Sequence, residues 1–393
     1  MADLDPDALL ILHAVPGPVA PRRALLDRYG TPNAAWAAGR RAWREAGLDE
    51  SQMRALEQPD DGILAPARAW LAQPGHHLLG WHDPAYPPQL RRLSSPPLAL
   101  FVDGDPALLW HPSVAIVGSR APSAGGRDNA RLFARNLADA GFAVISGLAA
   151  GIDTAAHEGA LAATSGLTVA VLGTGPDLAY PRENTGLRDR IAARGAVVSE
   201  HLPGTQARPS HFPSRNRILA GLSLGTLVVE AALRSGALIT ARQAADAGRE
   251  VFAIPGSIHN PLSRGCHQLI RDGVALVETA DEVIAAVLPV AASLAATLRS
   301  RLDGPISAPS ETCTAPMTPA LLDDPDYHKL WTALGHDPTG MDLLIERSRL
   351  TAAELSSMLL VMELEGLVSN RHGRYTRKTL SPIAPETGAG RGK

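Results

Sequence analysis

The segment Val114-Ala115-Ile116-Val117-Gly118 is apolar at every position and ends on a glycine. A strand with one solvated face would alternate apolar and polar residues, so this pattern indicates a strand buried on both faces. Six later runs have the same character: Phe142–Ser146, Thr168–Gly173, Ala196–Glu200, Thr226–Ala231, Glu250–Pro255 and Val274–Val277. Helical stretches such as Asp128–Ala140 and Ile239–Gly248 separate them. The alternation predicts βαβ units, and therefore an α/β fold with an open, mostly parallel, doubly wound, Rossmann-like sheet.

Residues 1–60 are predicted to form a small helical module that resembles a sterile-alpha-motif or helix-hairpin-helix domain. Ala8–Ala14 and Arg22–Tyr29 are helical segments separated by a Pro-Gly turn, and Trp36 and Trp43 have the spacing of one helical face. Hairpins that bind phosphate usually carry a second glycine two residues after the first. Val19 stands at that position here, which favours an interaction or structural role over DNA binding.

Composition divides the rest of the chain. The predicted parts are a proline-rich connecting segment that packs on the next domain (61–113), the sheet domain (114–284), a linker rich in Ala, Ser, Thr and Pro (285–322), a second small domain (323–380) and a disordered tail (381–393).

The second small domain has the pattern of a winged helix. Three predicted helices, 324–334, 339–347 and 351–365, precede a hairpin whose strands flank the turn at 372–373. The third helix carries acids and no base, so it is a poor reader of the major groove. The wing is basic, and any duplex or phosphate contact is expected from its four cations: Arg371, Arg374, Arg377 and Lys378. A protein-interaction or dimer-supporting role remains the alternative for this domain.

The bulk composition limits the classes of function. The net charge is −3 and the pI about 6.5, so a nucleic-acid site must be a local basic patch. The two cysteines, Cys266 and Cys313, cannot form a disulfide framework or a cysteine-rich metal site. The first residues lack a basic segment and no apolar run is long enough for a bilayer, so we expect a cytoplasmic protein without a signal peptide or membrane span.

Small residues follow several of the predicted strands. They occur in Gly118-Ser119-Arg120, Ser146-Gly147 and Gly173-Thr174-Gly175. Such residues let backbone N–H groups approach an anion at the carboxyl edge of the sheet, and several in a row suggest a ligand with several phosphates. No segment has a third glycine at dinucleotide spacing or a G-K-[ST] motif, so we expect no NAD or ATP cofactor.

The segment 208–223 combines cations with an aromatic ring. Arg208, Arg215 and Arg217 lie close in sequence to Phe212. Arginines can follow a phosphate backbone while a base stacks on the ring, which is what single-stranded nucleic acid needs. The alternative is that Phe212 belongs to the core and that Arg215 and Arg217 pair with Glu200 or Glu230.

Candidates for catalysis are few. Asp153 and His157 share a predicted helix face, but such a pair is more often a helix-terminal acid beside a structural histidine. Cys266-His267 is isolated and not a metal site. We therefore expect no catalytic residue and no metal.

Six motifs in order resemble one family. They are Val117–Arg120, Ser146–Ala149 with Gly151–Asp153 and His157, Tyr180–Asn184, Phe212–Ile218, Glu230-Ala231 with Ser235-Gly236 and Thr240-Ala241, and Pro255-Gly256. The series is similar to the DNA-processing protein A (DprA/Smf) family over residues 100–280. The resemblance implies an extended Rossmann fold that binds single-stranded DNA as a homodimer, without a nucleotide cofactor or a chemical step. It further implies that the protein protects incoming strands in natural transformation and loads RecA onto them.

The resemblance also implies roles for individual residues. Arg120 and the segment Arg215-Asn216-Arg217 would line a basic pocket, and Phe212 would be the base-stacking ring. Gly118, Ser119, Ser146 and Gly147 would give backbone or hydroxyl contacts to phosphate. Family members often carry a lysine a few residues before the phenylalanine, and the nearest cation here is Arg208.

The alternative function is enzymatic. Nucleoside monophosphate phosphoribohydrolases have similar sheets with an acid at a strand end, a position that Glu230 would fill. Their Gly-Gly-Gly-x-Gly-Thr run is reduced here to Gly225-Thr226, and it precedes a strand.

Overall fold

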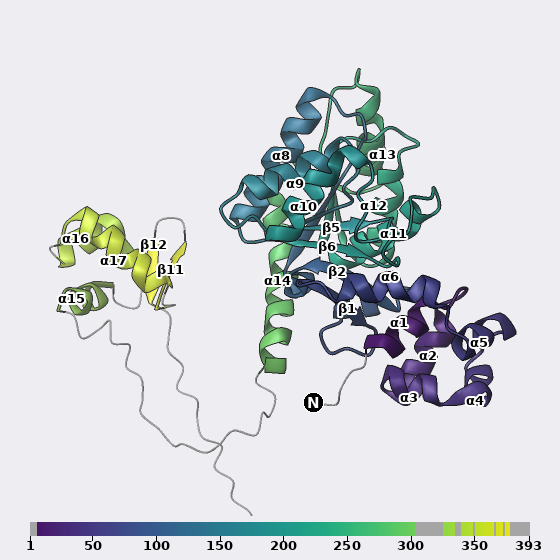
Figure 1. The fold of residues 1–393 in the computed structure, drawn as a ribbon. Helices are drawn as coiled ribbons and strands as arrows, with labels where there is room; N and C mark the ends of the chain where they lie inside the picture. The colour runs from purple at the N-terminus through teal and green to yellow at the C-terminus, as the bar shows by residue number, and fades with distance from the viewer. Residues whose placement is uncertain are drawn as a thin grey trace, which may run out of the picture. The chain divides into compact units, whose positions relative to one another are not determined.

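The computed structural model describes residues 6–302, 325–334, 339–348, 350–364, 367–371 and 374–377. The chain divides into two compact units, 1–304 and 305–393, and each is treated by itself (Figure 1). Among the described residues, no helix is both long enough and apolar enough to cross a bilayer.

The centre of the first unit is a nine-stranded sheet with the order β1-β2-β6-β5-β4-β3-β7-β8-β9. All seven strands predicted from apolar runs are present and pair in parallel: β3 (Ser113–Val117), β4 (Ala143–Ser146), β5 (Thr168–Leu172), β6 (Ala196–Ser199), β7 (Gly225–Val228), β8 (Glu250–Ala253) and β9 (Ala275–Leu276). The chain runs outward from β3 through β4 and β5 to β6, then returns to the other side of β3 with β7. The topological switch point therefore lies between β3 and β7.

The segment predicted as a connection, 61–113, is instead divided: residues 61–71 form the last helix of the N-terminal module, and residues 76–104 belong to the sheet. It contributes β1 (His76–Gly80) and β2 (Ala99–Gly104), which pair antiparallel, and β2 pairs antiparallel with β6. The apolar stretch Leu98–Val102 leads into β2, and its residues are buried because the strand lies inside the sheet. A 3₁₀ turn (Pro106–Trp110) leads from β2 to β3.

Helices cover both faces of the sheet. Ala115 and Val117 face a core built with α11 (His211–Leu222), α12 (Gly236–Asp246) and α13 (Arg264–Arg271). Val114 and Ile116 face the opposite core, built with α8 (Ala124–Asp139), α9 (Ile152–Ala162) and α14 (Ala280–Leu302). Successive strand residues point to opposite faces of the sheet, and a core covers each face. Every residue of a central strand is therefore buried, which explains the uninterrupted apolar runs. The remaining helix of this domain, α10 (Thr185–Arg194), packs near β5 and β6 and follows the 3₁₀ turn Arg182–Asn184.

Helix α14 corrects the predicted domain boundary at 285. The helix continues to Leu302, and Val283, Val287 and Ala291 are buried at helical spacing. Alanine has a high helix propensity, so an alanine-rich segment forms a helix where one of its faces packs on a core, although its composition alone predicts a linker. The rest of the predicted linker, 303–322, lies outside the described residues, as does the tail 381–393.

The N-terminal module consists of six helices: α1 (Pro6–Ala14), α2 (Ala20–Tyr29), α3 (Pro32–Ala37), α4 (Gly39–Glu45), α5 (Glu50–Glu57) and α6 (Asp61–Leu71). A short helix, α7 (Pro88–Arg91), lies between β1 and β2. Trp36 and Trp43 lie on two helices and not on one face, because Gly39 adopts φ +77° and breaks the segment. The side chain of Arg22 lies against the connection between α1 and α2. It donates to the carbonyl oxygens of Leu12 at 3.0 Å and Gly17 at 2.8 Å, so these backbone groups are already engaged within the protein.

The second unit has the elements of a winged helix: α15 (Pro325–Leu334), β10 (Thr339–Gly340), α16 (Met341–Ser348), α17 (Ala352–Leu364), β11 (Val368–Arg371) and β12 (Arg374–Arg377). A capping box precedes α17, with Thr351 N donating to Glu354 at 2.8 Å and Glu354 N donating to Thr351 at 3.3 Å. Thr339, the first residue of the second predicted helix, instead pairs in a short strand with β12. Lys378 and the turn 372–373 lie outside the described residues.

Candidate nucleic-acid interface

A pocket of about 510 Å³ lies at the carboxyl edge of the sheet, at the switch point. Its lining comes from the loops after β3, β4, β5 and β7 and from the first turns of α11 and α12. Ligands bind in this crevice of doubly wound sheets because the loops from both halves diverge there. The fold brings part of the predicted set into the lining of this pocket: Gly118, Arg120, Phe212, Arg215 and Asn216.

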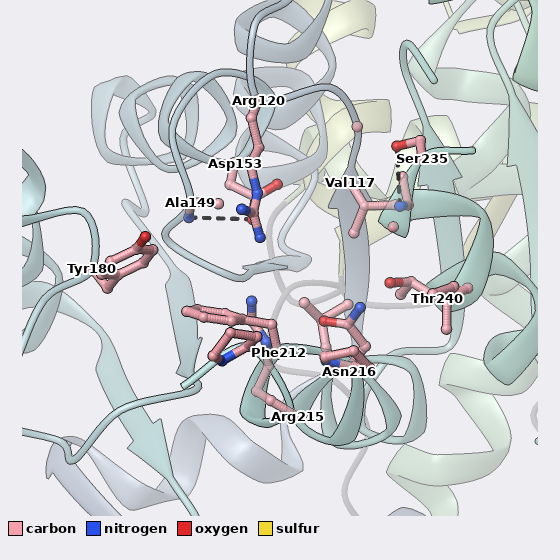
Figure 2. Close-up of a pocket in the computed structure, with 17 residues that line it drawn as sticks. Val117, Arg120, Ala149, Asp153, Tyr180, Phe212, Arg215, Asn216, Ser235 and Thr240 are labelled. Atoms are coloured by element: carbon pink, nitrogen blue, oxygen red, sulfur yellow. Dashed lines mark hydrogen bonds between the residues drawn. The ribbon is translucent and has the colours of Figure 1, made fainter. Parts of the chain in front are cut away.

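Arg120 and Phe212 face each other in this pocket. Figure 2 shows the arginine projecting from the loop after β3 toward the phenylalanine ring. The guanidinium carbon lies 5.5 Å from the ring centroid, which is a cation–π distance. Arg120 is exposed and forms no ion pair with any described residue. It is therefore free to exchange water for the phosphate of a ligand.

Arg215 lines the same pocket but is buried. Its guanidinium donates to the carbonyl oxygen of Gly147 at 2.8 Å and also to that of Val171. A side chain at Gly147 would meet the guanidinium at 2.3 Å, so this glycine makes room for the arginine. Burial lowers the pKa of Arg215 to about 10, which leaves it charged at neutral pH. Arg215 is thus a fixed positive charge beneath the pocket, and its hydrogen bonds hold the ends of β4 and β5 together.

Asp153 occupies the turn where phosphate contacts were predicted. Its carboxylate accepts from Gly147 N at 3.2 Å and from Ala149 N at 3.3 Å, and Figure 2 shows the second of these bonds. Burial raises its pKa, while Arg215 and the two backbone N–H groups oppose that shift. Gly147 N is therefore engaged inside the protein. Ser146 is fully buried and donates to Ile116 O at 2.7 Å, so its hydroxyl does not face the pocket either.

Three other residues predicted for the site have different places. Arg217 forms an ion pair with Glu200 at 2.5 Å and lies outside the pocket lining, as the alternative interpretation had it. Arg208 is exposed at the approach to α11, and it also lies outside the lining. Asn216 lines the pocket, and its amide forms no hydrogen bond within the described part of the chain.

The loop after β3 supplies the last two predicted contacts. Gly118 lines the pocket, and a side chain there would strike Ile152 and the backbone of Glu230 at 2.7 and 2.9 Å. The hydroxyl of Ser119 accepts from Ala121 N at 3.2 Å, and this residue lies beside the lining. The glycine thus allows close backbone approach, whereas the serine shapes the loop that carries Arg120.

Sequence reasoning missed two walls of the pocket. Tyr180 forms one side, and Ser235 and Thr240 form the other (Figure 2). Ser235 caps α12 by accepting from Ala237 N at 3.2 Å, so a helix N-terminus also faces the cavity. An exposed aromatic residue ahead of a proline in a strand-end loop was the available signal for Tyr180.

Two of the three catalytic candidates, His157 and Glu230, are engaged inside the protein. The imidazole of His157 is fully buried, with Nδ1 at 2.8 Å from the Thr168 hydroxyl, and burial lowers its pKa to about 3. The carboxylate of Glu230 accepts from Ser123 N at 2.9 Å, Ser123 Oγ at 2.6 Å and Asn260 at 3.0 Å. Neither residue lines the pocket. The described residues contain no cluster of ligands that would hold a metal ion.

Comparison with known proteins identifies the family. The family model of DNA recombination-mediator protein A matches residues 77–288, more than half of the chain. The chain belongs to this family. A second model, the DprA winged helix domain, matches residues 314–374.

The matching curated relatives and solved structures include proteins named Smf or DprA. Protein Smf of Escherichia coli is 40% identical over 313 residues, covering 78% of this chain and 79% of the relative. DNA processing protein DprA of Streptococcus pneumoniae is 48% identical over 203 residues, covering 52% of this chain and 71% of the relative. The crystal structure of the pneumococcal DprA superposes with a TM-score of 0.62 at 37% identity, covering 70% of this chain and 95% of that one.

A fourth match describes a ligand. DNA processing protein A of Helicobacter pylori superposes with a TM-score of 0.50 at 29% identity, covering 55% of this chain and 96% of that one. That structure was reported for its single-stranded-DNA binding mode. As a DprA family member, the present chain is a DNA-processing, recombination-related protein with an α/β sheet domain and a C-terminal winged helix.

Proposed function

We propose that this member of the DprA family binds single-stranded DNA in the pocket at the switch point and acts as a recombination mediator. The observation that carries the proposal is the pairing of the exposed, uncommitted Arg120 with the Phe212 ring in one cavity. A cation beside an exposed aromatic ring binds single strands because every base has a face to stack and every nucleotide a phosphate. The buried charge of Arg215 adds positive potential below the same cavity.

The partners follow from family membership. We propose that the protein works in the cytoplasm as a homodimer, protects strands taken up in natural transformation and loads RecA onto them. No nucleotide cofactor and no chemical step belong to this proposal. The wing residues Arg371, Arg374 and Arg377 would add phosphate contacts that are independent of sequence.

A binding titration across salt concentrations tests the proposal. Single strands should bind more tightly than duplex of the same length, because a duplex hides its base faces. The logarithm of the affinity should fall with the logarithm of salt by about 0.7 for each phosphate neutralised. Equal affinity for both forms, or affinity without salt dependence, would contradict the proposal, and release of free base from nucleotides would favour the phosphoribohydrolase alternative.

A further inference from the structure

A second pocket lies beside the first on the same edge of the sheet. Its volume is about 300 Å³, and its walls are the segment after β5, from Thr174 to Thr185, and the Gln206-Ala207 loop after β6. In the sheet, β5 is two strands away from β3, at the first pocket. Strands repeat about every 4.8 Å, so the strand ends that frame the two pockets lie about 10 Å apart. One extended polymer can therefore occupy both.

Tyr180 is the wall that the two pockets share. It lines both cavities and is 45% exposed, which is high for an aromatic side chain in a structured loop. Its ring centroid lies 5.2 Å from that of Phe212, with the planes at 43°. Arg120, Phe212 and Tyr180 thus form a continuous row of groups on which bases can stack.

The loop that carries Tyr180 is fixed to the first pocket. The amide of Asn184 donates to Leu148 O at 2.9 Å and to the Thr154 hydroxyl at 3.0 Å. Leu148 belongs to the turn between β4 and α9, and Thr154 lies in the first turn of α9. The same segment supplies Ala149 and Asp153 to the first pocket. The spacing between the two cavities is therefore set by hydrogen bonds, and a ligand need not order the loop.

The polar groups of the second pocket suit a nucleotide. Arg182 is exposed and forms no ion pair within the described residues, so it can take a phosphate. Asp177 is held by Gly204 N at 2.8 and 3.0 Å, and Gln206 lies beside it in the lining. Carboxylate and amide oxygens accept from the amino groups of bases. A pocket with an acid and a cation fits a base together with its phosphate better than it fits a phosphate alone.

We propose that this second pocket is a subsite for the next part of the same single strand. A base stacks on the face of Tyr180 that is turned to the second pocket, and Arg182 pairs with the adjoining phosphate. The strand then runs along the carboxyl edge of the sheet from β3 toward β6. This inference rests on the proposed function of the first pocket.

The test uses the full chain and unlabelled oligodeoxycytidylates of two lengths, one that fills a single pocket and one that spans both. The double variant Arg182→Ala/Gln206→Ala changes the second pocket only, and Phe212→Ala changes the first. Arg190→Ala is the matched control, because this exposed arginine lies on the adjacent helix α10 outside both linings. Competition against a labelled long oligonucleotide gives the affinities.

We expect the double variant to bind the longer oligonucleotide about 5- to 10-fold more weakly, with a salt slope smaller by about 0.7, and to bind the short one normally. Phe212→Ala should weaken both, and Arg190→Ala neither. If Phe212→Ala weakens both lengths while the double variant behaves like Arg190→Ala, the second subsite is refuted and the first pocket stands. If Phe212→Ala binds both lengths like the wild type, the proposed function fails and the subsite fails with it.

Discussion

The loop after β3 and the first turns of α11 both bring arginines toward the strand-end pocket, but they use them differently. Arg120 is exposed and free of ion pairs within the described residues. Arg215 is buried beneath the cavity on two carbonyl oxygens, and Arg217 is paired with Glu200 outside it. Arginines that look equivalent in a motif can therefore divide into one that meets the ligand and others that build the site. The following predictions separate the two kinds.

The largest effect is expected at Arg215. Arg215→Met removes the donors to Gly147 and Val171 and leaves the buried Asp153 without its nearby positive charge. Loss of one partner from a buried charged network costs about 3–5 kcal/mol of unfolding free energy. Urea denaturation followed by tryptophan fluorescence measures the loss, with Arg217→Met as the comparison. A variant as stable as the wild type would show that Arg215 does not hold the strand ends together.

The charge of Arg215 also contributes to a pH dependence. Burial, and secondarily Arg215, lower the pKa of His157 from 6.5 to about 3. Below pH 6.5 this histidine becomes protonated in the unfolded chain but stays neutral in the folded chain. Its contribution to the free energy of unfolding is therefore complete above that pH and is lost as the pH falls toward 3. The loss from this residue is about 3 kcal/mol at pH 4.5. His157→Gln should flatten that part of the stability–pH curve, and an unchanged curve would contradict the buried, neutral imidazole.

Phe212 tests the exposed side of the comparison. Phe212→Leu keeps an apolar side chain but removes the ring, so binding of single strands should weaken by about 1–3 kcal/mol. The unfolding free energy should change by less than about 1.5 kcal/mol, because the ring is only half-buried. Equal losses in binding and stability would instead make Phe212 a core residue.

The sequence predicted the parallel strands because both faces of the sheet are covered, which leaves long apolar runs. It did not predict β1 and β2 as strands. These two strands pair across a proline-rich stretch, and β2 also pairs with β6, which is distant in sequence. The length of α14 was missed because an alanine-rich segment is helical only where a core receives it.

At the site, the sequence predicted Arg120 and Phe212, and both line the pocket. The family motifs also predicted that strand-end loops distant in sequence form one pocket. The separation of Arg217 from the pocket was left open, because its pairing with Glu200 is set by the fold and not by local spacing. The same reason applies to Ser146 and Gly147. Their polar groups are engaged with Ile116 and Asp153, and these partners are visible only once the strands are in register.

The most direct test of the account compares Arg120→Ala with Arg217→Ala in binding to oligothymidylate across salt. The account predicts that Arg120→Ala weakens binding and lowers the salt slope by about 0.7, with unfolding free energy within about 0.5 kcal/mol of wild type. It predicts that Arg217→Ala binds with the wild-type slope while losing about 1–2 kcal/mol of stability with its ion pair. A wild-type slope for Arg120→Ala, or a reduced slope for Arg217→Ala, would contradict it.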